Sequence, residues 1–240
     1  WSSDVCSSDL GTESFSVSQD ITAALISFDG DSQIIQPSGT ITATTLDLLD
    51  SATNITLGQV TNDFGSVTAT ANNLTLADTN AIQLNNITAS SFTLTAGGNV
   101  TDGTNVTISI ANSATFNAGA NAITLGNDAG DTVNFGTLDI TGGAVTLTES
   151  SGSSIDNLSA SSITLNSAGH ITDTTNATIS VTGTADLSVT DNTIYDIILG
   201  EGVSDSLALG NVRVDARDVD LTEQSSGTNF TGTKIGRAHV

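Results

Sequence analysis

Short runs of alternating apolar and polar residues recur along almost the whole chain, for example at 55–57, 92–94, 163–165 and 219–221. A period of two is that of a β-strand, which points the apolar pair to one face and the intervening Thr or Asp to the other. Gly, Asn, Asp and Ser fill the gaps between the runs, as at 97–99 and 127–131, and these residues form turns. Because no stretch keeps helical spacing, the pattern predicts an all-β protein of many short strands.

The chain also repeats itself over longer distances. The segment 87–108 (ITASSFTLTAGGNVTDGTNVTI) realigns with 158–179 (LSASSITLNSAGHITDTTNATI), at an offset of 71 positions. Two further sets have three members each, at offsets between 68 and 74 positions: ITLG, ITLG and IILG at 55–58, 123–126 and 197–200, and LTLAD, VTLTE and VDLTE at 74–78, 145–149 and 219–223. A shorter offset of 46 positions relates 41–48 to 87–94.

These offsets favour one β architecture over others. Strands every 8 to 14 positions also suit a sandwich or an up-and-down barrel. The self-similarity instead favours a parallel β-helix, or β-solenoid, because offsets of 46 and 71 fit two and three turns of a coil of roughly 23 to 24 residues. We therefore predict about nine coils, each with about three strands. Inward aliphatic residues would form columns such as Leu76, Leu147 and Leu221, and outward Thr would form ladders.

The two ends of the chain differ from the rest. Residues 4–10 can be encoded by GACGTGTGCTCTTCCGATCT, and residues 234–240 by the reverse complement of the same string. Both ends resemble a sequencing-library adapter translated in frame, so we interpret 1–10 and 234–240 as adapter-derived artefacts. A secretory signal would need a basic and then an apolar region, which 1–10 lacks.

Removing these ends leaves a single predicted solenoid domain over 11–233. The only Trp, the only Cys (Cys6) and one of the two His (His239) fall in the removed segments. We expect 11–233 to be an internal fragment of a longer protein that continues into further coils on both sides.

Composition narrows the possible functions. The chain of 240 residues has 26 acidic and 4 basic residues and a net charge of −22, and 11–233 keeps that charge because the two ends together are neutral. Nucleic-acid binding is not expected, since clusters of Lys and Arg are absent. One Cys excludes a disulfide framework and a Cys-ligated zinc site. No apolar run has the length of a membrane span.

Three phrases carry a family resemblance. ITLG…NDFG at 55–65, TLTAGGNVTDG at 93–103 and NAITLGNDAGD at 121–131 resemble repeats of filamentous-haemagglutinin-type large exoproteins, which are bacterial surface or secreted adhesins. The resemblance covers most of 41–223. It implies an elongated, right-handed parallel β-helix at the cell surface, exported by two-partner secretion or as an autotransporter, and it supplies no catalytic residues.

His170 and the aspartates are the first candidate site residues. His170, with Asp173 three residues on, occupies the position of Asn99 with Asp102 in the preceding repeat, so we interpret it as a solvated turn residue rather than an acid–base or metal residue. Other aspartates cluster in turns, and weak, adventitious calcium binding there is plausible without a specific site. They are Asp128, Asp131, Asp215, Asp218 and Asp220.

Arg213 and Arg217 are the only bases of 11–233. They align with Asp139 and Gly143 of the previous unit, and neighbouring acids are expected to pair with them in a solvated patch. Polysaccharide lyases and glycosidases also use β-helices, with carboxylates converging on one face. An ice-binding face is not expected for the Thr ladders, because offsets of 68, 71 and 74 break the regularity of the coils.

The sequence therefore predicts a non-enzymatic spacer segment of an adhesin-like exoprotein, extracellular or on the bacterial outer-membrane surface. Catalytic residues, cofactors and metal ligands are assigned to none of its positions. Its partners would be host or environmental glycans or matrix, reached through the full-length protein. The alternative is a carbohydrate-active β-helix enzyme or a glycan-binding module.

Overall fold

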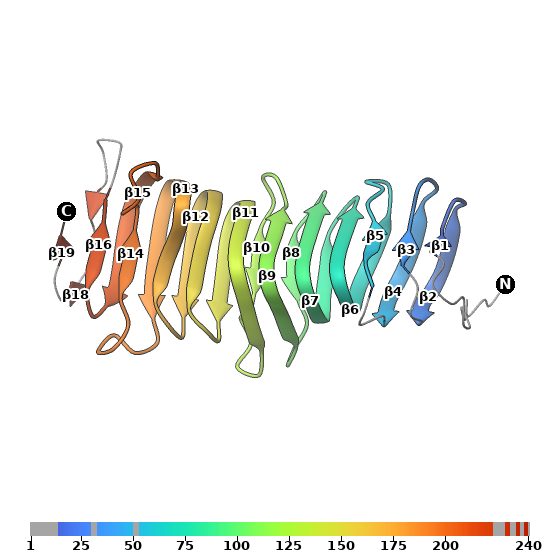
Figure 1. The fold of residues 1–240 in the computed structure, drawn as a ribbon, viewed down its shortest axis with the longest axis horizontal. Helices are drawn as coiled ribbons and strands as arrows, with labels where there is room; N and C mark the ends of the chain where they lie inside the picture. The colour runs from blue at the N-terminus through green and yellow to red at the C-terminus, as the bar shows by residue number, and fades with distance from the viewer. Residues whose placement is uncertain are drawn as a thin grey trace.

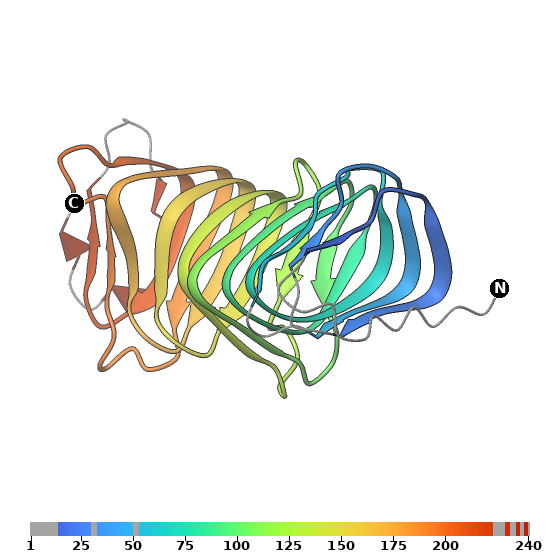
Figure 2. The ribbon, with the colours of Figure 1, turned by 45° about the vertical axis from the view of Figure 1, so that its right-hand side comes forward.

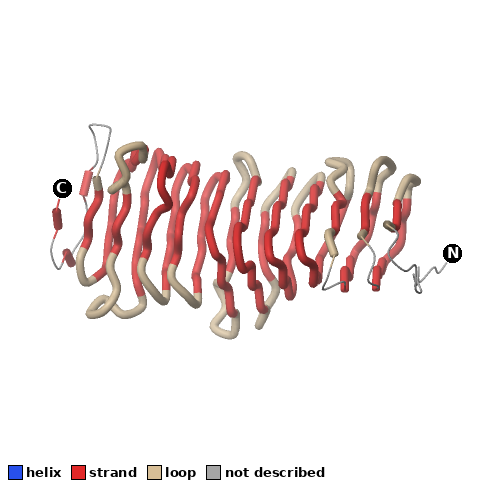
Figure 3. Tube along the Cα trace, in the orientation of Figure 1, coloured by secondary structure: helices blue, strands red, loops and turns tan. Residues whose placement is uncertain are grey.

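The computed structural model describes residues 14–29, 33–49 and 53–222, together with the backbone of three short strands near the end of the chain. Nineteen strands form one continuous parallel sheet that winds into an elongated stack, with the N-terminal strands at one end and the C-terminal strands at the other (Figure 1). The described residues contain strands and turns but no helix (Figure 3).

The strands differ widely in length. Long strands bend around corners of the stack, and short strands of two or three residues occupy a single side. In chain order they are β1 (Phe15–Ser16), β2 (Ile21–Asp29), β3 (Ile34–Ile35), β4 (Ile41–Leu49), β5 (Ile55–Leu57), β6 (Asp63–Asp78), β7 (Ile82–Ala96), β8 (Val100–Asp102), β9 (Thr107–Asn117), β10 (Ile123–Leu125), β11 (Thr132–Glu149), β12 (Ser153–Ser167), β13 (Ile171–Val189), β14 (Ile197–Leu199), β15 (Ser206–Ala216), β16 (Val219–Leu221), β17 (Asn229–Phe230), β18 (Lys234–Ile235) and β19 (Ala238–His239).

Each coil passes over three faces before it stacks on the next coil (Figure 2). We name the faces A, B and C in the order in which the chain meets them. Face A contains 82–84, 100–102, 123–125, 145–147, 163–165, 185–187 and 212–214. Face B contains 87–89, 108–110, 133–135, 153–155, 171–173, 197–199 and 219–221. Face C contains 74–76, 92–94, 114–116, 138–140, 158–160, 179–181 and 207–209.

Inward side chains stack in columns along the axis. The longest column on face C joins one residue from each of eight successive coils: Leu57, Leu76, Leu94, Phe116, Ile140, Leu158, Ile179 and Leu207. Its members are buried. Phenylalanines reinforce the core: the Phe116 ring lies edge-on to Phe92 and to Phe135, with centroids 5.6 and 5.5 Å apart. Burial of such side chains contributes about 1.5–3 kcal/mol each.

The predicted all-β parallel solenoid is confirmed, but its coil is shorter than expected. Leu57 and Leu207 are seven coils apart in the same column, so one coil averages about 21 positions of the chain, and the chain makes about ten turns. Paired positions of successive coils on face C are 18 apart at Ile140 and Leu158 but 28 apart at Ile179 and Leu207. Corner loops of different length absorb this variation (Figure 3). The right-handed winding stays a prediction.

The repeat offsets are not whole numbers of coils, which corrects the sequence interpretation. Three coils from Leu94 on face C lead through Phe116 and Ile140 to Leu158, an offset of 64 positions. The residue 71 positions after Leu94 is Leu165, which lies on face A between Leu147 and Leu187. One repeat unit therefore equals three coils plus one face.

The offset of 46 positions behaves in the same way. Two coils from Leu48 lead through Ala69 to Ile87 on face B, whereas Leu94, which is 46 positions after Leu48, lies on face C. This offset therefore equals two coils plus one face.

The predicted column of Leu76, Leu147 and Leu221 is accordingly wrong. All three point inward, but Leu76 lies on face C, Leu147 on face A and Leu221 on face B. Equivalent residues of successive units are thus rotated by one face around the axis.

The predicted boundaries at the ends remain untested. Residues 1–10 lie outside the described residues, and only the backbone of β18 and β19 is described within 234–240.

Candidate functional site

Two equivalent corners carry most of the aspartates singled out from the sequence. Asp102 Oδ2 accepts a hydrogen bond from the Gly126 amide at 2.5 Å, and Asp173 Oδ2 accepts one from the Gly200 amide at 2.6 Å. Both glycines have positive φ, +71° and +80°. A Cβ at Gly126 would overlap the Thr148 carbonyl oxygen, so the corner requires glycine.

A second aspartate closes each corner. Asp131 Oδ1 accepts the Val106 amide at 3.0 Å, and Asp205 Oδ1 accepts the Ala177 amide at 3.0 Å. Their second oxygens accept amides within their own turns, those of Asp128 and Gly202. These carboxylates are therefore used as caps for backbone amides, which would otherwise lose hydrogen bonds on burial.

The electrostatics of these corners reflect burial. Burial raises the pKa of Asp102, and the charges of Asp131 and Asp128 add to the rise. Burial likewise raises the pKa of Asp173, with Asp205 and Glu201 adding to it. Within the described ranges, no group of three or more His, Cys, Asp or Glu side chains is arranged to hold a metal ion. Weak calcium binding at these turns stays a prediction.

His170 takes the structural place of Asn99. Its Nδ1 accepts the Asp196 amide at 3.0 Å, as Asn99 Oδ1 accepts the Ala122 amide at 3.0 Å. His170 and Asp173 bond different segments of the next coil, so they do not form an acid–base pair. Because Nδ1 accepts this bond, the ring lone pair that a general base would need is already engaged.

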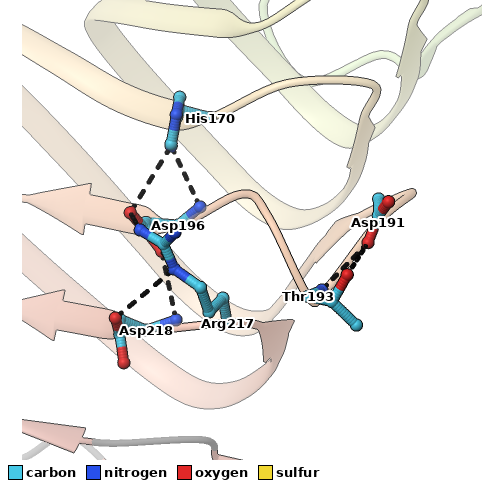
Figure 4. Close-up of polar contacts among 6 residues, drawn as sticks. All are labelled: His170, Asp191, Thr193, Asp196, Arg217 and Asp218. Carbon is cyan, nitrogen blue, oxygen red and sulfur yellow. Dashed lines mark hydrogen bonds and ion pairs between the residues drawn. The ribbon is translucent and has the colours of Figure 1, made fainter.

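Arg217 lies in a polar cluster with Asp196, Asp218 and His170, shown in Figure 4. Its Nε and Nη2 donate to the nearly buried Asp196 carboxylate at 2.8 and 2.5 Å, and Nε lies 3.5 Å from an Asp218 oxygen. The hydrogen bonds to Asp196 raise the pKa of Arg217 further above its usual value. The His170 ring lies edge-on to Tyr195, with centroids 5.4 Å apart. The cluster joins three successive coils.

The loop that leads into this cluster is held by its own side chains. The Thr193 amide and hydroxyl both donate to Asp191 Oδ1, at 3.0 and 2.6 Å, and these bonds lower the pKa of Asp191 (Figure 4).

The other candidate residues stand apart from the Arg217 cluster. Arg213 pairs with Asp186 of the preceding coil at 3.1 Å, and both side chains are solvated. Asp215 accepts the Asn192 amide group at 2.6 Å, whereas Asp220 stacks beside Ile198. The structure thus pairs both arginines with acids, as expected from the sequence, but Arg217 binds a nearly buried carboxylate rather than a solvated one.

Sequence reasoning missed a set of inward-facing polar residues. Asp78 and Glu149 end the LTLAD and VTLTE repeats, and each accepts the amide of a phenylalanine 14 residues earlier, Phe64 at 2.6 Å and Phe135 at 2.9 Å. The signal was available, because the period of two that buries 74 and 76, or 145 and 147, also directs 78 and 149 inward. The third member of the set ends on Glu223, which lies outside the described residues.

Gln36 and Asn62 form a second missed element. Their side-chain amides bond each other reciprocally at 2.7 and 2.8 Å, and Asn62 Oδ1 also accepts the Ile41 amide at 2.9 Å. This buried pair spans two successive coils, and sequence spacing alone carries no signal for it.

The outward Thr ladders are regular in spite of unequal coils. Thr56, Thr75, Thr93 and Thr115 stack in direct register on face C. Unequal coils alone do not break this ladder, because the corners absorb the length differences; it ends because Asp139 follows Thr115 in the file, and the absence of an ice-binding face stays a prediction. The neighbouring file on face C consists of Ala77, Thr95 and Asn117. A second Thr file, of Thr101, Thr124, Thr146 and Thr164, stands on face A.

Comparisons with known proteins add one family. A family model described as repeats of unknown function (DUF5649) matches residues 71–140 and 142–206, more than half of the chain. The starts of the two matches are offset by 71 positions, as are successive units of three coils plus one face. No curated protein and no solved structure matches the chain. No helix in the described part is long and apolar enough to cross a bilayer.

Proposed function

Because the chain belongs to the family of repeats of unknown function (DUF5649), we propose its role from its architecture: it is a non-enzymatic spacer segment of a secreted or surface-exposed bacterial exoprotein of the adhesin type. The resemblance of 55–65, 93–103 and 121–131 to filamentous-haemagglutinin-type repeats supports the extracellular or outer-membrane setting. The coiled stack itself is the observation that carries the spacer role.

A stacked solenoid converts sequence length into reach. Neighbouring parallel strands are about 4.8 Å apart, so about ten coils span about 48 Å along the axis. A unit of three coils plus one face adds about 16 Å. Each coil contacts only its neighbours, so units can be added without changing the coils already present.

The surface chemistry fits a rod that stays separate in solution. A net charge of −22 opposes lateral association, and the exposed large apolar side chains are scattered along the chain rather than gathered. Among the residues that the structure describes, they are Leu25, Leu49, Val60, Ile194 and Val203. The Thr and Asn files offer shallow polar contacts, for which we propose glycans or matrix as partners.

The polar groups support a structural role over a catalytic one. Asp131 and Asp205 cap backbone amides, His170 accepts an amide, and Arg217 is held by Asp196. A glycosidase needs two carboxyl groups free to face a bound sugar, and a lyase needs a cation free to stabilise charge. In the corners and the Arg217 cluster these groups hold the coils together.

The direct test is activity on polysaccharides. The purified 240-residue chain is incubated with a panel of neutral, uronic-acid and amino-sugar polymers, and new reducing ends and unsaturated products are measured. We expect no turnover, and retention of some polymers at most. Turnover of any polymer would overturn the spacer proposal in favour of a carbohydrate-active enzyme.

The cellular setting needs its own experiment. Antibodies against the chain are applied to intact cells that produce the full-length protein, with a cytoplasmic protein as the control for lysis. We expect labelling of intact cells or recovery of the protein in the medium. Signal only after lysis would contradict the proposed surface location.

A further inference from the structure

Glu149 lies in an unusual position at the end of β11, in the middle of the stack. The residue is 1% exposed, and its Oε1 accepts the Phe135 amide at 2.9 Å. Its Oε2 is buried and has no hydrogen-bond partner among the described residues. The Ser153 hydroxyl, at the start of β12, is buried and lacks a hydrogen bond of standard geometry as well, yet it lies near enough to Glu149 to act on the pKa of its carboxyl. An ionised carboxylate so placed would have only the Phe135 amide and the Ser153 hydroxyl to compensate it, and burial of a charge with so few donors is costly in a protein interior.

The equivalent residue of the preceding unit is fully bonded, which makes Glu149 the exception. Asp78 accepts the Phe64 amide on Oδ1 at 2.6 Å and the Asn80 amide on Oδ2 at 3.0 Å. Glu149 has one methylene more and only one amide donor. Burial raises the pKa of both residues, but the second oxygen of Asp78 accepts a backbone amide, whereas Glu149 has in its place only the Ser153 hydroxyl, which can donate or accept.

Charged groups on the packed elements do not compensate Glu149. In the preceding coil, Asp131 is bonded to the Val106 and Asp128 amides, and the Asp128 side chain is exposed. In the following coil, His170 Nδ1 accepts the Asp196 amide and lies 3.7 Å from the Asp196 carboxylate. Burial is the largest cause acting on the pKa of Glu149 and raises it, whereas the Ser153 hydroxyl and the Phe135 amide lower it by a smaller amount.

We propose that Glu149 holds a proton in the folded solenoid, that the protonated carboxyl donates to the Ser153 hydroxyl, and that loss of this proton loosens the joint between β11 and β12. This joint is then a pH-sensitive point in the middle of the rod. The inference concerns the stability of the stack and holds whether or not the spacer role is correct.

The direction of the effect follows from the two protonation states. Burial raises the pKa of Glu149 from 4.5 to about 7. Below the unfolded value both states hold the proton, so its stabilising contribution is complete. Between pH 4.5 and about 7 the unfolded chain ionises while the folded chain does not, so stability falls as pH rises. Above the folded value the loss is complete.

The test compares wild type with Glu149→Gln in urea unfolding at pH 5 and pH 8. Glutamine keeps the shape, its oxygen can accept the Phe135 amide, and its amide can donate to Ser153 without a titratable proton. The ratio of the wild-type to the variant unfolding equilibrium constant is expected to rise on the order of 50- to 100-fold from pH 5 to pH 8. Glu201→Gln removes the same charge at an exposed position and should leave the ratio unchanged within about two-fold.

A second measurement does not depend on the variant. The side-chain carboxyl carbon of Glu149 is titrated by NMR in the wild-type chain, with assignment from the spectrum that lacks it. We expect a midpoint near 7, and faster hydrogen exchange of the Phe135 amide above it after correction for intrinsic rates. A midpoint near 4.5, or a pH-independent ratio of unfolding constants for a folded Glu149→Gln variant, would overturn the proposal.

Discussion

Phe116 shows how single residues carry the core of this narrow rod. It is buried in the face C column between Leu94 and Ile140, and its ring contacts Phe92 and Phe135 edge-on. A solenoid with such short coils has room for few side chains in each layer. One large ring therefore fills space that the residues above and below it cannot reach, because protein interiors are close-packed.

Truncation of this ring should be among the most destabilising substitutions in the chain. We expect Phe116→Ala to lower the free energy of unfolding by about 3–5 kcal/mol, because a cavity is left between three coils. Thr115→Ala, one residue earlier on the outward ladder, should stay within about 0.5 kcal/mol. Urea unfolding followed by circular dichroism measures both, and equal losses would contradict the assigned inward and outward faces.

The two arginines, Arg217 and Arg213, differ in how deeply their acidic partners are buried. Arg217 neutralises the nearly buried Asp196, whereas Arg213 and Asp186 are both solvated. We expect Arg217→Gln to lower the melting temperature clearly, because it leaves the nearly buried carboxylate of Asp196 without its cation. Arg213→Gln should leave the melting temperature nearly unchanged, because Asp186 is solvated. Melting in low and high salt measures the difference. A larger drop for Arg213→Gln would contradict the pairing.

The corner is the element that makes unequal coils compatible with a regular stack. Gly126 and Gly200 turn the chain with positive φ, and Asp102 and Asp173 of the previous coil bind their amides. The loops that follow these glycines, 127–131 and 201–205, are equally long, whereas the corner between β11 and β12 holds only residues 150–152; the strands beyond the corners return to register all the same. Differences in coil length are therefore confined to the corner loops and do not disturb the backbone hydrogen bonds between stacked strands.

This arrangement makes a matched pair of glycine substitutions informative. Gly126→Ala should destabilise the chain by about 2 kcal/mol or more, because left-handed backbone is unfavourable for alanine and its Cβ would overlap the Thr148 carbonyl. Gly119 also has positive φ, +57°, but no atom lies within 4 Å of its Cβ position, so Gly119→Ala should cost only about 1 kcal/mol. Thermal unfolding of both variants decides it, and equal effects would argue against the close approach at Gly126.

Strands and corners differ in how far the sequence could predict them. The apolar–Thr–apolar units are strands because a period of two is a local property of the chain. The coil length depends on how many residues each corner loop holds, and those loops leave no periodic signal. The inward orientation of Asp78 and Glu149 could be predicted from the strand period of two. The Gln36–Asn62 pair could not, because it depends on a register between coils that only the folded stack defines.

At the scale of the whole molecule, one sequence repeat unit is longer than three complete coils by one face. Three units, each with an offset of 71 positions, correspond to ten coils, so equivalent residues return to the same face only at every third unit. A longer rod would therefore present each unit's surface on all three faces in turn. The sequence could not predict this rotation, because offsets of 46 and 71 are equally consistent with a longer coil and no rotation.

Adding a unit should lengthen the rod by a fixed step. Duplication of residues 71–141 after position 141 inserts three coils plus one face and should raise the maximum dimension in solution scattering by about 16 Å. The cross-section should not change, because no coil is added beside the stack. A thicker particle of unchanged length would contradict growth along the axis.

The most direct test of the stacked solenoid is a distance between residues far apart in sequence. Thr95 and Ala208 lie in one outward file, five coils apart, through Asn117, Thr141, Ser159 and Ser180. With spin labels at these two positions in a Cys6→Ser background, pulsed electron resonance should give one narrow distribution centred at about 24 Å. A broad distribution, or a mean beyond about 40 Å, would contradict the parallel stack of short coils on which the account rests.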